Sequence, residues 1–138
     1  MAKKIVHISG KRKMASARIT ITDGNGTIRI NNVPVDIFGS DALNMKVKET
    51  LLIASDQIDL NKINIDLKVK GGGIMGQSDA ICSSIARGLC EWVGGDALLN
   101  AYTSYDRTLI AGDHRLTETH KPSQSSKGPR HKRQKSYR

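Results

Sequence analysis

Residues 63–77 read INIDLKVKGGGIMGQ, an alternating segment that runs directly into a glycine-rich turn. In residues 63–70 every second residue is apolar, which is the pattern of a β-strand with one buried face. After Gly76, apolar residues recur at helical spacing as far as the glycine pair at 94–95, which predicts a long helix that ends at glycine. A strand, a glycine turn and a helix therefore form the centre of the predicted fold.

Five further elements are expected around this unit: strands at 4–8, 15–22 and 27–30, and helices at 41–54 and 96–102. A basic turn at Gly10–Lys13 is predicted to end the strand at 4–8 and to lead into the strand at 15–22. Asp23–Gly26 is typical of a hairpin turn. Ser40 or Asp41 is the expected N-cap of the helix at 41–54, and Asp96 that of the helix at 96–102. The sequence thus predicts one mixed α/β (α+β) domain.

Positive charge is concentrated near the C-terminus. The 138 residues carry a net charge of +9, and residues 114–138 hold eight of the 22 basic residues but one of the 13 acidic ones. From Thr117 onward the one apolar residue is Tyr137, so this segment cannot bury enough surface to offset the entropy of ordering it. We therefore predict a compact body over residues 1–113. An extended basic tail over 114–138 is expected to be disordered alone and ordered on a polyanionic partner.

Other patterns narrow the class of protein. Cys82 and Cys90 lie eight residues apart on one predicted helix, roughly 12 Å apart, and are interpreted as reduced core residues of a cytosolic protein. No apolar run has the length of a membrane span or of a signal peptide, so a soluble cytoplasmic protein is expected. The four histidines are scattered, and Ser78 beside Asp79 is interpreted as a helix N-cap. We expect no catalytic site, no metal, no cofactor and no small-molecule substrate.

The glycine-rich turn has more than one interpretation. Gly71, Gly73 and Gly76 match the GxGxxG pattern of dinucleotide-binding enzymes, in which glycines let the backbone approach a phosphate. However, no later strand ending in an acidic residue follows at the required distance, and Gln77 stands where a P-loop would have lysine. The same glycines suit an RNA phosphate, or a tight turn that requires glycine. A small nucleotide-dependent enzyme and a free nucleic-acid-binding module therefore remain as alternatives.

Basic side chains mark the candidate contacts with nucleic acid. Lys11, Arg12, Lys13 and Arg18 lie in or near the predicted turn, where cations can hold phosphates. The tail adds cations on a chain that can follow a phosphate backbone and release counterions. These tail residues are Arg115, Lys121, Lys127, Arg130, Lys132, Arg133, Lys135 and Arg138.

Three blocks in this order resemble the universal ribosomal protein S-nine family. The first is Gly10–Lys13 with Ala15, Ala17 and Arg18, and the second is Gly71–Gly73 with Gly76, Gln77 and the helix beyond them. The third comprises Asp113, Arg115, Glu118, Gly128, Arg130 and the ending QKSYR, which is similar to the archaeal and eukaryotic branch. His114 and the residues Thr119–Lys121 depart from the pattern of many relatives.

The resemblance implies a fold and a function. It implies a small β-α-β sandwich similar to the second domain of ribosomal protein S-five, in the head of the small ribosomal subunit. Its partners would be small-subunit (16S-type) rRNA, peptidyl-site tRNA and neighbouring head proteins. The tRNA contacts would come from Lys135, Tyr137 and Arg138. The rRNA contacts would come from Lys11, Arg12, Lys13, Arg18, Gly71, Gly72, Gly73, Gln77, Arg115, Lys121, Lys127, Arg130, Lys132 and Arg133.

Overall fold

The computed structural model describes residues 4–120, in which one mixed sheet carries all the strands. Its strands are β1 (Ile5–Arg12), β2 (Ala15–Asp23), β3 (Ile28–Ile30), β4 (Val33–Pro34) and β5 (Ile63–Lys70). They lie in the order β1-β2-β5-β3-β4. β3 is parallel to β5, and the other neighbours are antiparallel.

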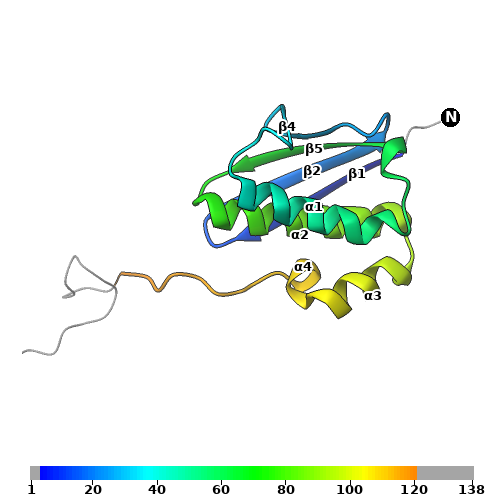
Figure 1. Ribbon diagram of the computed structural model, residues 1–138. Helices are drawn as coiled ribbons and strands as arrows, with labels where there is room; N and C mark the ends of the chain where they lie inside the picture. The colour runs from blue at the N-terminus through cyan, green and yellow to red at the C-terminus, as the bar shows by residue number, and fades with distance from the viewer. Residues whose placement is uncertain (1–3, 121–138) are drawn as a thin grey trace, which may run out of the picture.

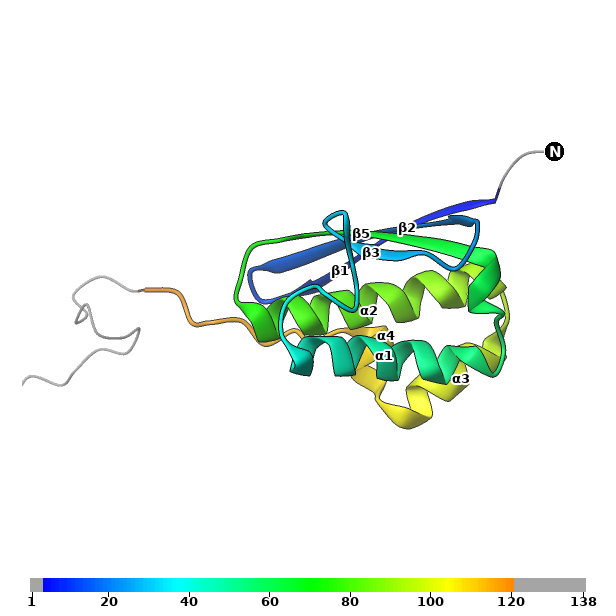
Figure 2. The same cartoon turned by 45° about the horizontal axis from the view of Figure 1, so that its top comes forward.

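The helices cover one face of this sheet in two layers (Figures 1 and 2). They are α1 (Asp41–Ser55), the short 3-10 helix η1 (Leu60–Lys62), α2 (Ile74–Val93), α3 (Asp96–Tyr105) and α4 (Arg107–Ala111). α1 and α2 lie directly below the sheet, and α3 and α4 lie below them (Figure 1). The mixed α/β fold expected from the sequence is confirmed.

The core lies between the sheet and α2. Ile19 and Ile21 of β2 and Leu67 of β5 point toward the helices, and each is at most 1% exposed. Ile85 and Leu89 of α2 meet them and are fully buried. Burial of such side chains stabilises the fold by about 1.5–3 kcal/mol each. The core therefore consists mainly of aliphatic side chains at the positions that the strand and helix periodicities mark.

A buried tyrosine joins the second helix layer to the first. The Tyr102 side chain of α3 is 0% exposed, and its hydroxyl donates a hydrogen bond of 2.8 Å to the Thr50 carbonyl of α1. Burial raises the pKa of this phenol, so it remains a neutral donor. This contact fixes α3, and with it the start of the segment that leads to the tail.

Several sequence expectations need correction at the ends of elements. β1 continues through Lys11 and Arg12, so the expected basic turn is only Lys13 and Met14, with Lys13 at φ 53°. Helix α2 begins at Ile74, ahead of Gly76, because Gly73 provides its extended N-cap. β4, η1 and α4 were not predicted, since segments of two to five residues carry too little periodicity.

Two of the predicted helix caps are also wrong. Ser78 lies inside α2, is 0% exposed and has no partner for its hydroxyl, so it is not an N-cap. Asp96 lies in the first turn of α3, and the N-cap is Gly95. Ser40 is the N-cap of α1, as one of the two alternatives proposed, but its side chain makes no capping hydrogen bond.

Candidate nucleic-acid interface

The β1–β2 turn and the glycine turn pack against each other at one end of the molecule. A Cβ atom on Gly71 would lie 2.6 Å from the Met14 carbonyl oxygen, and one on Gly72 would lie 2.9 Å from the Ala15 nitrogen. Both glycines have positive φ, +78° and +69°. The interpretation as a tight turn that requires glycine therefore applies to these two residues.

Gly73 is different, because its surroundings are open. A Cβ atom there would have no neighbour within 4 Å, and the residue has an extended φ of −105°. Gln77 lies in the first turn of α2 and its side-chain amide donates a hydrogen bond of 3.1 Å to the Gly71 carbonyl. The turn is thus held from inside by Gln77, while the backbone at Gly73 stays accessible at a helix N-terminus.

The elements around the glycine turn do not form a dinucleotide site. That site needs a second parallel strand after the helix, ending in an acidic residue. Here α2 is followed by α3, and β5 pairs in antiparallel register with β2. Within residues 4–120 there is also no cluster of three potential metal ligands and no helix long and apolar enough to cross a membrane.

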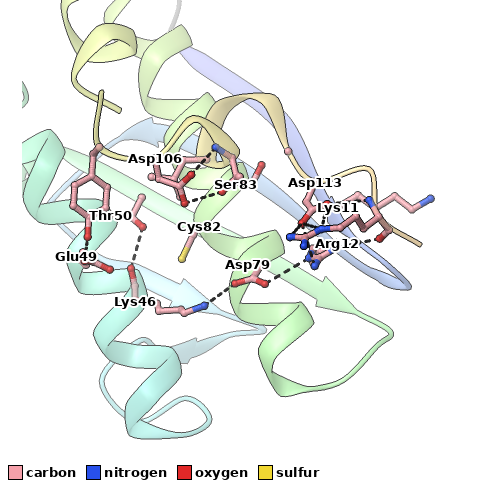
Figure 3. A pocket seen from close by; sticks show the side chains of 15 residues that line it. Lys11, Arg12, Lys46, Glu49, Thr50, Asp79, Cys82, Ser83, Asp106 and Asp113 are labelled. Atoms are coloured by element: carbon pink, nitrogen blue, oxygen red, sulfur yellow. Dashed lines mark hydrogen bonds and ion pairs between the residues drawn. The ribbon is translucent and has the colours of Figure 1, made fainter. Parts of the chain in front are cut away.

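Arg12 connects the end of β1 with the segment that follows α4 (Figure 3). Its Nη2 lies 3.1 Å from Asp113 Oδ2, its Nη1 donates to the Arg115 carbonyl at 3.1 Å, and its Nε lies 3.6 Å from Asp79 Oδ2. Asp79 in turn accepts a hydrogen bond of 2.8 Å from Lys46 of α1, which raises the pKa of that lysine. We call Arg12, Asp79 and Asp113 the anchor cluster.

Arg115 completes the attachment of this segment. Its guanidinium Nη2 lies 2.6 Å from Asp113 Oδ2, and its backbone N–H donates 2.9 Å to Asp113 Oδ1. These bonds from Arg115, together with the charge of Arg12, hold the pKa of Asp113 well below its ordinary range. Asp113 is therefore charged throughout the neutral range.

A third arginine, from α2, fixes the exit of the chain from α4. Arg87 of α2 donates a hydrogen bond of 2.7 Å from Nε to the Ile110 carbonyl, and its Nη1 reaches the Ser9 carbonyl at 3.5 Å. Gly112 has φ +75°, and a Cβ atom there would lie 3.0 Å from Arg87 Nη2. Residues 112–115 are therefore held between β1 and α2, and the chain then runs away from the body (Figure 1).

A pocket of about 400 Å³ lies between α1, α2 and the α4 region, beside the anchor cluster (Figure 3). Its lining includes the cation of Lys46 and the carboxylates of Glu49, Asp79 and Asp106. Burial raises the pKa of the Cys82 thiol in its wall, so this cysteine is an unreactive thiol. The charges around the pocket are mixed, and it has neither the basic character of a phosphate site nor a metal-ligand set.

The structure brings together most of the predicted RNA-contact residues of the described chain, in two different situations. Lys11 and Lys13 are exposed and form no ion pair within residues 4–120. Arg12 and Arg115 lie beside them but are engaged with Asp113. Arg18 lies elsewhere, on the face of the sheet away from the helices. The remaining predicted positions, Lys121, Lys127, Arg130, Lys132, Arg133, Lys135, Tyr137 and Arg138, lie outside the described residues.

No role was assigned from the sequence to the carboxylates that pair with Arg12, which are Asp79 and Asp113, or to Arg87. The Asp113–His114–Arg115 order carries a local signal, because aspartate often accepts a hydrogen bond from the backbone two residues on. Asp79 and Arg87 carry no such signal. Their partners are more than 20 residues away in sequence, so only the fold brings them together.

We expect the anchor cluster to persist at mildly acidic pH. Because the pKa of folded Asp113 is lowered, its ion pairs stabilise the folded state above the unfolded pKa and are lost only as pH falls below about 4. A 13C NMR titration of the Asp113 side-chain carboxyl from pH 7 to pH 2 should show no transition above about pH 4. A transition near pH 6 would contradict the cluster.

Comparison with known proteins identifies relatives over nearly the whole chain. A family model described as ribosomal protein S9/S16 matches residues 10–138. Small ribosomal subunit protein uS9 of Methanococcus maripaludis strain C7 is 47% identical over 135 residues, which cover 98% of this chain and 99% of the relative. The proteins of the same name from Methanococcus vannielii and Methanothrix thermoacetophila are 46% and 45% identical over the same shares of both chains.

Proposed function

Because this chain belongs to the ribosomal protein S9/S16 family, we propose that its body binds small-subunit rRNA in the head of the subunit and that its tail reaches peptidyl-site tRNA. Membership itself makes the chain a structural protein of the small ribosomal subunit and not an enzyme. It also places the protein in the ribosome, in the cytoplasm, and its relatives above are archaeal. The nucleotide-dependent enzyme considered from the GxGxxG pattern is therefore excluded.

One observation supports the rRNA contact most directly. The β1–β2 turn, the glycine turn and the anchored exit toward the tail all lie at the same end of the body (Figures 1 and 2). Lys11 and Lys13 project there without ionic partners among the described residues, and the backbone at Gly73 is open. Unpaired cations beside an accessible helix N-terminus suit phosphate groups.

The geometry divides the predicted contacts into two roles. We assign Lys11, Lys13 and the Gly73 backbone to phosphate contact. Arg12 and Arg115 are assigned to orienting the chain that leads to the tail, because their guanidinium groups are engaged with Asp113. Gly71, Gly72 and Gln77 shape the turn that presents these groups.

We assign the tail, residues 114–138, to rRNA and tRNA. It carries eight basic residues against one acidic residue, so its contacts are with phosphates and carry little base specificity. Lys121, Lys127, Arg130, Lys132 and Arg133 are assigned to rRNA, and Lys135, Tyr137 and Arg138 to the tRNA anticodon stem. Neighbouring head proteins complete the set of proposed partners.

Gradient sedimentation tests this function. A tagged copy of the full chain, expressed in its own cell, should sediment with small subunits at high magnesium and remain bound after a high-salt wash. A chain that stays at the top of the gradient would contradict the assignment, and a chain removed by the wash would indicate a loosely associated factor.

We expect deletion of Ser136–Arg138 to leave the body folded and to weaken peptidyl-site tRNA binding, by about threefold to tenfold. The deleted residues include one cation, Arg138, and each phosphate contact contributes a modest share of the affinity. Filter binding of tRNA to reconstituted subunits measures the loss, and thermal unfolding of the free protein measures the fold. A charge-matched control, Lys48→Gln, removes one exposed cation from the helix side. A lowered unfolding temperature in the deletion variant would mean that the tail belongs to the core.

A further inference from the structure

The face of the sheet opposite the helices carries positive charge that the described chain leaves unpaired. Four exposed cations occupy outward positions of three strands, Arg18 of β2, Arg29 of β3, and Lys68 and Lys70 of β5. None of them forms an ion pair within residues 4–120. We call these four residues the outer basic face.

The strand register brings these cations close together. Arg18 and Lys68 are directly opposite each other in the antiparallel β2–β5 pair. Lys70 follows Lys68 on the same side of β5, roughly 7 Å along the strand. Arg29 is opposite Asp66, which is the outward residue of β5 next to Lys68. Asp66 is the one acidic residue at an outward position of the described strands.

This arrangement works against the stability of the free protein. Like charges directly opposite each other in a sheet are destabilising, because the two side chains lie about 5 Å apart. The sequence could relieve the repulsion with an acidic residue on β1, but the β1 residue opposite Arg18 is Ser9. A polyanion bound across the strands would be attracted to each of these cations and would reduce the repulsion between them.

The rest of the face indicates what kind of polyanion fits. No Phe, Tyr or Trp lies in any described strand, and the one ring at an outward position, His7 of the edge strand β1, contacts Thr20, so the face offers little surface for stacking bases. The outward neighbours of the cations are small and hydroxylated: Ser9, Ser16 and Thr20. Small side chains allow a close approach, and hydroxyl groups can donate to phosphate oxygens. Cations with small polar neighbours and no Phe, Tyr or Trp fit a nucleic-acid backbone that is recognised by its charge.

We propose that the outer basic face is a second RNA-binding surface of the body, which holds the phosphate backbone of an rRNA segment across β2, β5 and β3. The inference rests on the proposed function, because it assigns part of the rRNA contact to a surface of which the family resemblance included only Arg18. It extends along the strands from the end formed by the β1–β2 turn and the glycine turn, which it adjoins at Lys70. The body would then contact RNA on two sides, with the helices facing away from the sheet-bound segment.

The test compares two triple variants of the full chain that lose the same charge. The face variant carries Arg18→Gln, Lys68→Gln and Lys70→Gln. The control variant carries Lys48→Gln, Lys62→Gln and Arg107→Gln, which removes three exposed cations outside the sheet. The probe is a transcript of the head domain of small-subunit rRNA, titrated by filter binding at several potassium concentrations.

We expect the face variant to bind the transcript at least tenfold more weakly than the control at physiological salt. Three lost phosphate contacts should also reduce the slope of log affinity against log salt by about 2. A third variant with Lys68→Arg and Lys70→Arg keeps the charge and should bind like the wild type. Thermal unfolding of the face variant should be unchanged or improved, because cross-strand repulsion is removed.

Each contrary outcome has a distinct meaning. If the face and control variants bind with equal affinity and slope while the wild type binds well, the outer basic face is not an RNA surface, and the proposed function stands. If the face variant binds the transcript normally but fails to enter subunits, its partner is an acidic protein surface, which also overturns the inference. If the wild type does not distinguish the transcript from an unrelated RNA, the proposed function fails and the inference fails with it.

Discussion

Gly10→Ala should lower the free energy of unfolding by about 3 kcal/mol, the largest effect that we expect from a single methyl group in this protein. Gly10 is buried in β1, where a Cβ atom would lie 2.3 Å from the Ala80 carbonyl oxygen and 2.8 Å from the Ser84 nitrogen. Both are backbone atoms of α2, so no side-chain rotation can relieve the contact. The helix would have to move away from β1, which would also disturb its packing on β2.

Urea unfolding of the full chain followed by circular dichroism measures this loss, which corresponds to a midpoint temperature about 10 °C lower. Gly73→Ala is the matched control, because a Cβ atom there meets nothing within 4 Å and φ is not positive. That variant should remain within about 0.5 kcal/mol of the wild type. Equal stability of the two variants would mean that β1 and α2 do not approach as closely as the structure has them.

Gly10 also illustrates where sequence reasoning reached its limit. Its neighbours Lys11, Arg12 and Lys13 indicated an exposed turn, because three consecutive cations seldom occupy a strand. The strand instead continues to Arg12, and the glycine is required by a helix that begins 64 residues later at Ile74. A close approach between segments that are distant in sequence leaves no local pattern. The sequence therefore shows a glycine at position 10 but not the helix that requires it.

Periodicity, by contrast, predicted the elements that form the core. The alternation of residues 63–70 gave β5 with its correct boundaries, and its inward positions are buried as expected. The helical spacing of Ile81, Ile85 and Leu89 gave the buried face of α2. These signals succeed because burial acts on every second residue of a strand and about every fourth residue of a helix.

The alternation of residues 63–70 also marks two residues of the outer basic face as polar, but it does not indicate that positive charge gathers on that face. Lys68 and Lys70 occupy the polar positions of β5, where lysine is an ordinary solvent-exposed residue. Only the strand register shows that Arg18 is directly opposite Lys68 and that no helix covers this side (Figure 2). Local sequence predicts which face of a strand is polar, whereas the charge density of that face depends on which strands are neighbours.

The anchor cluster depends on the shape of one side chain. The Arg12 guanidinium is planar and presents donors in several directions, which lets it contact Asp79, Asp113 and the Arg115 carbonyl together. Its side chain is 15% exposed and that of Asp113 is 13% exposed, so water screens the pair less than it would at an open surface. The cluster therefore sets the direction in which the chain leaves the body.

We expect Arg12→Lys to release residues 113–116 from the body and to lower the free energy of unfolding by about 1–2 kcal/mol. An ammonium group is a compact charge on a flexible stem and cannot make these three contacts at once. Asp79 keeps Lys46 and Asp113 keeps Arg115, which limits the loss because neither carboxylate is left alone. Amide hydrogen exchange at Arg115 should accelerate by at least tenfold, and thermal unfolding should report the change in stability.

Lys48→Ala is the control for this variant, because it removes an exposed ion pair with Asp36, which should contribute no more than about 1 kcal/mol. In reconstituted subunits, Arg12→Lys should also weaken peptidyl-site tRNA binding although the tail sequence is intact, because the proposed tRNA contact requires the tail to leave the body in a fixed direction. If Arg12→Lys matches Lys48→Ala in both exchange and stability, the guanidinium is not an anchor. Arg12 would then be available to bind RNA directly, as the family resemblance first implied.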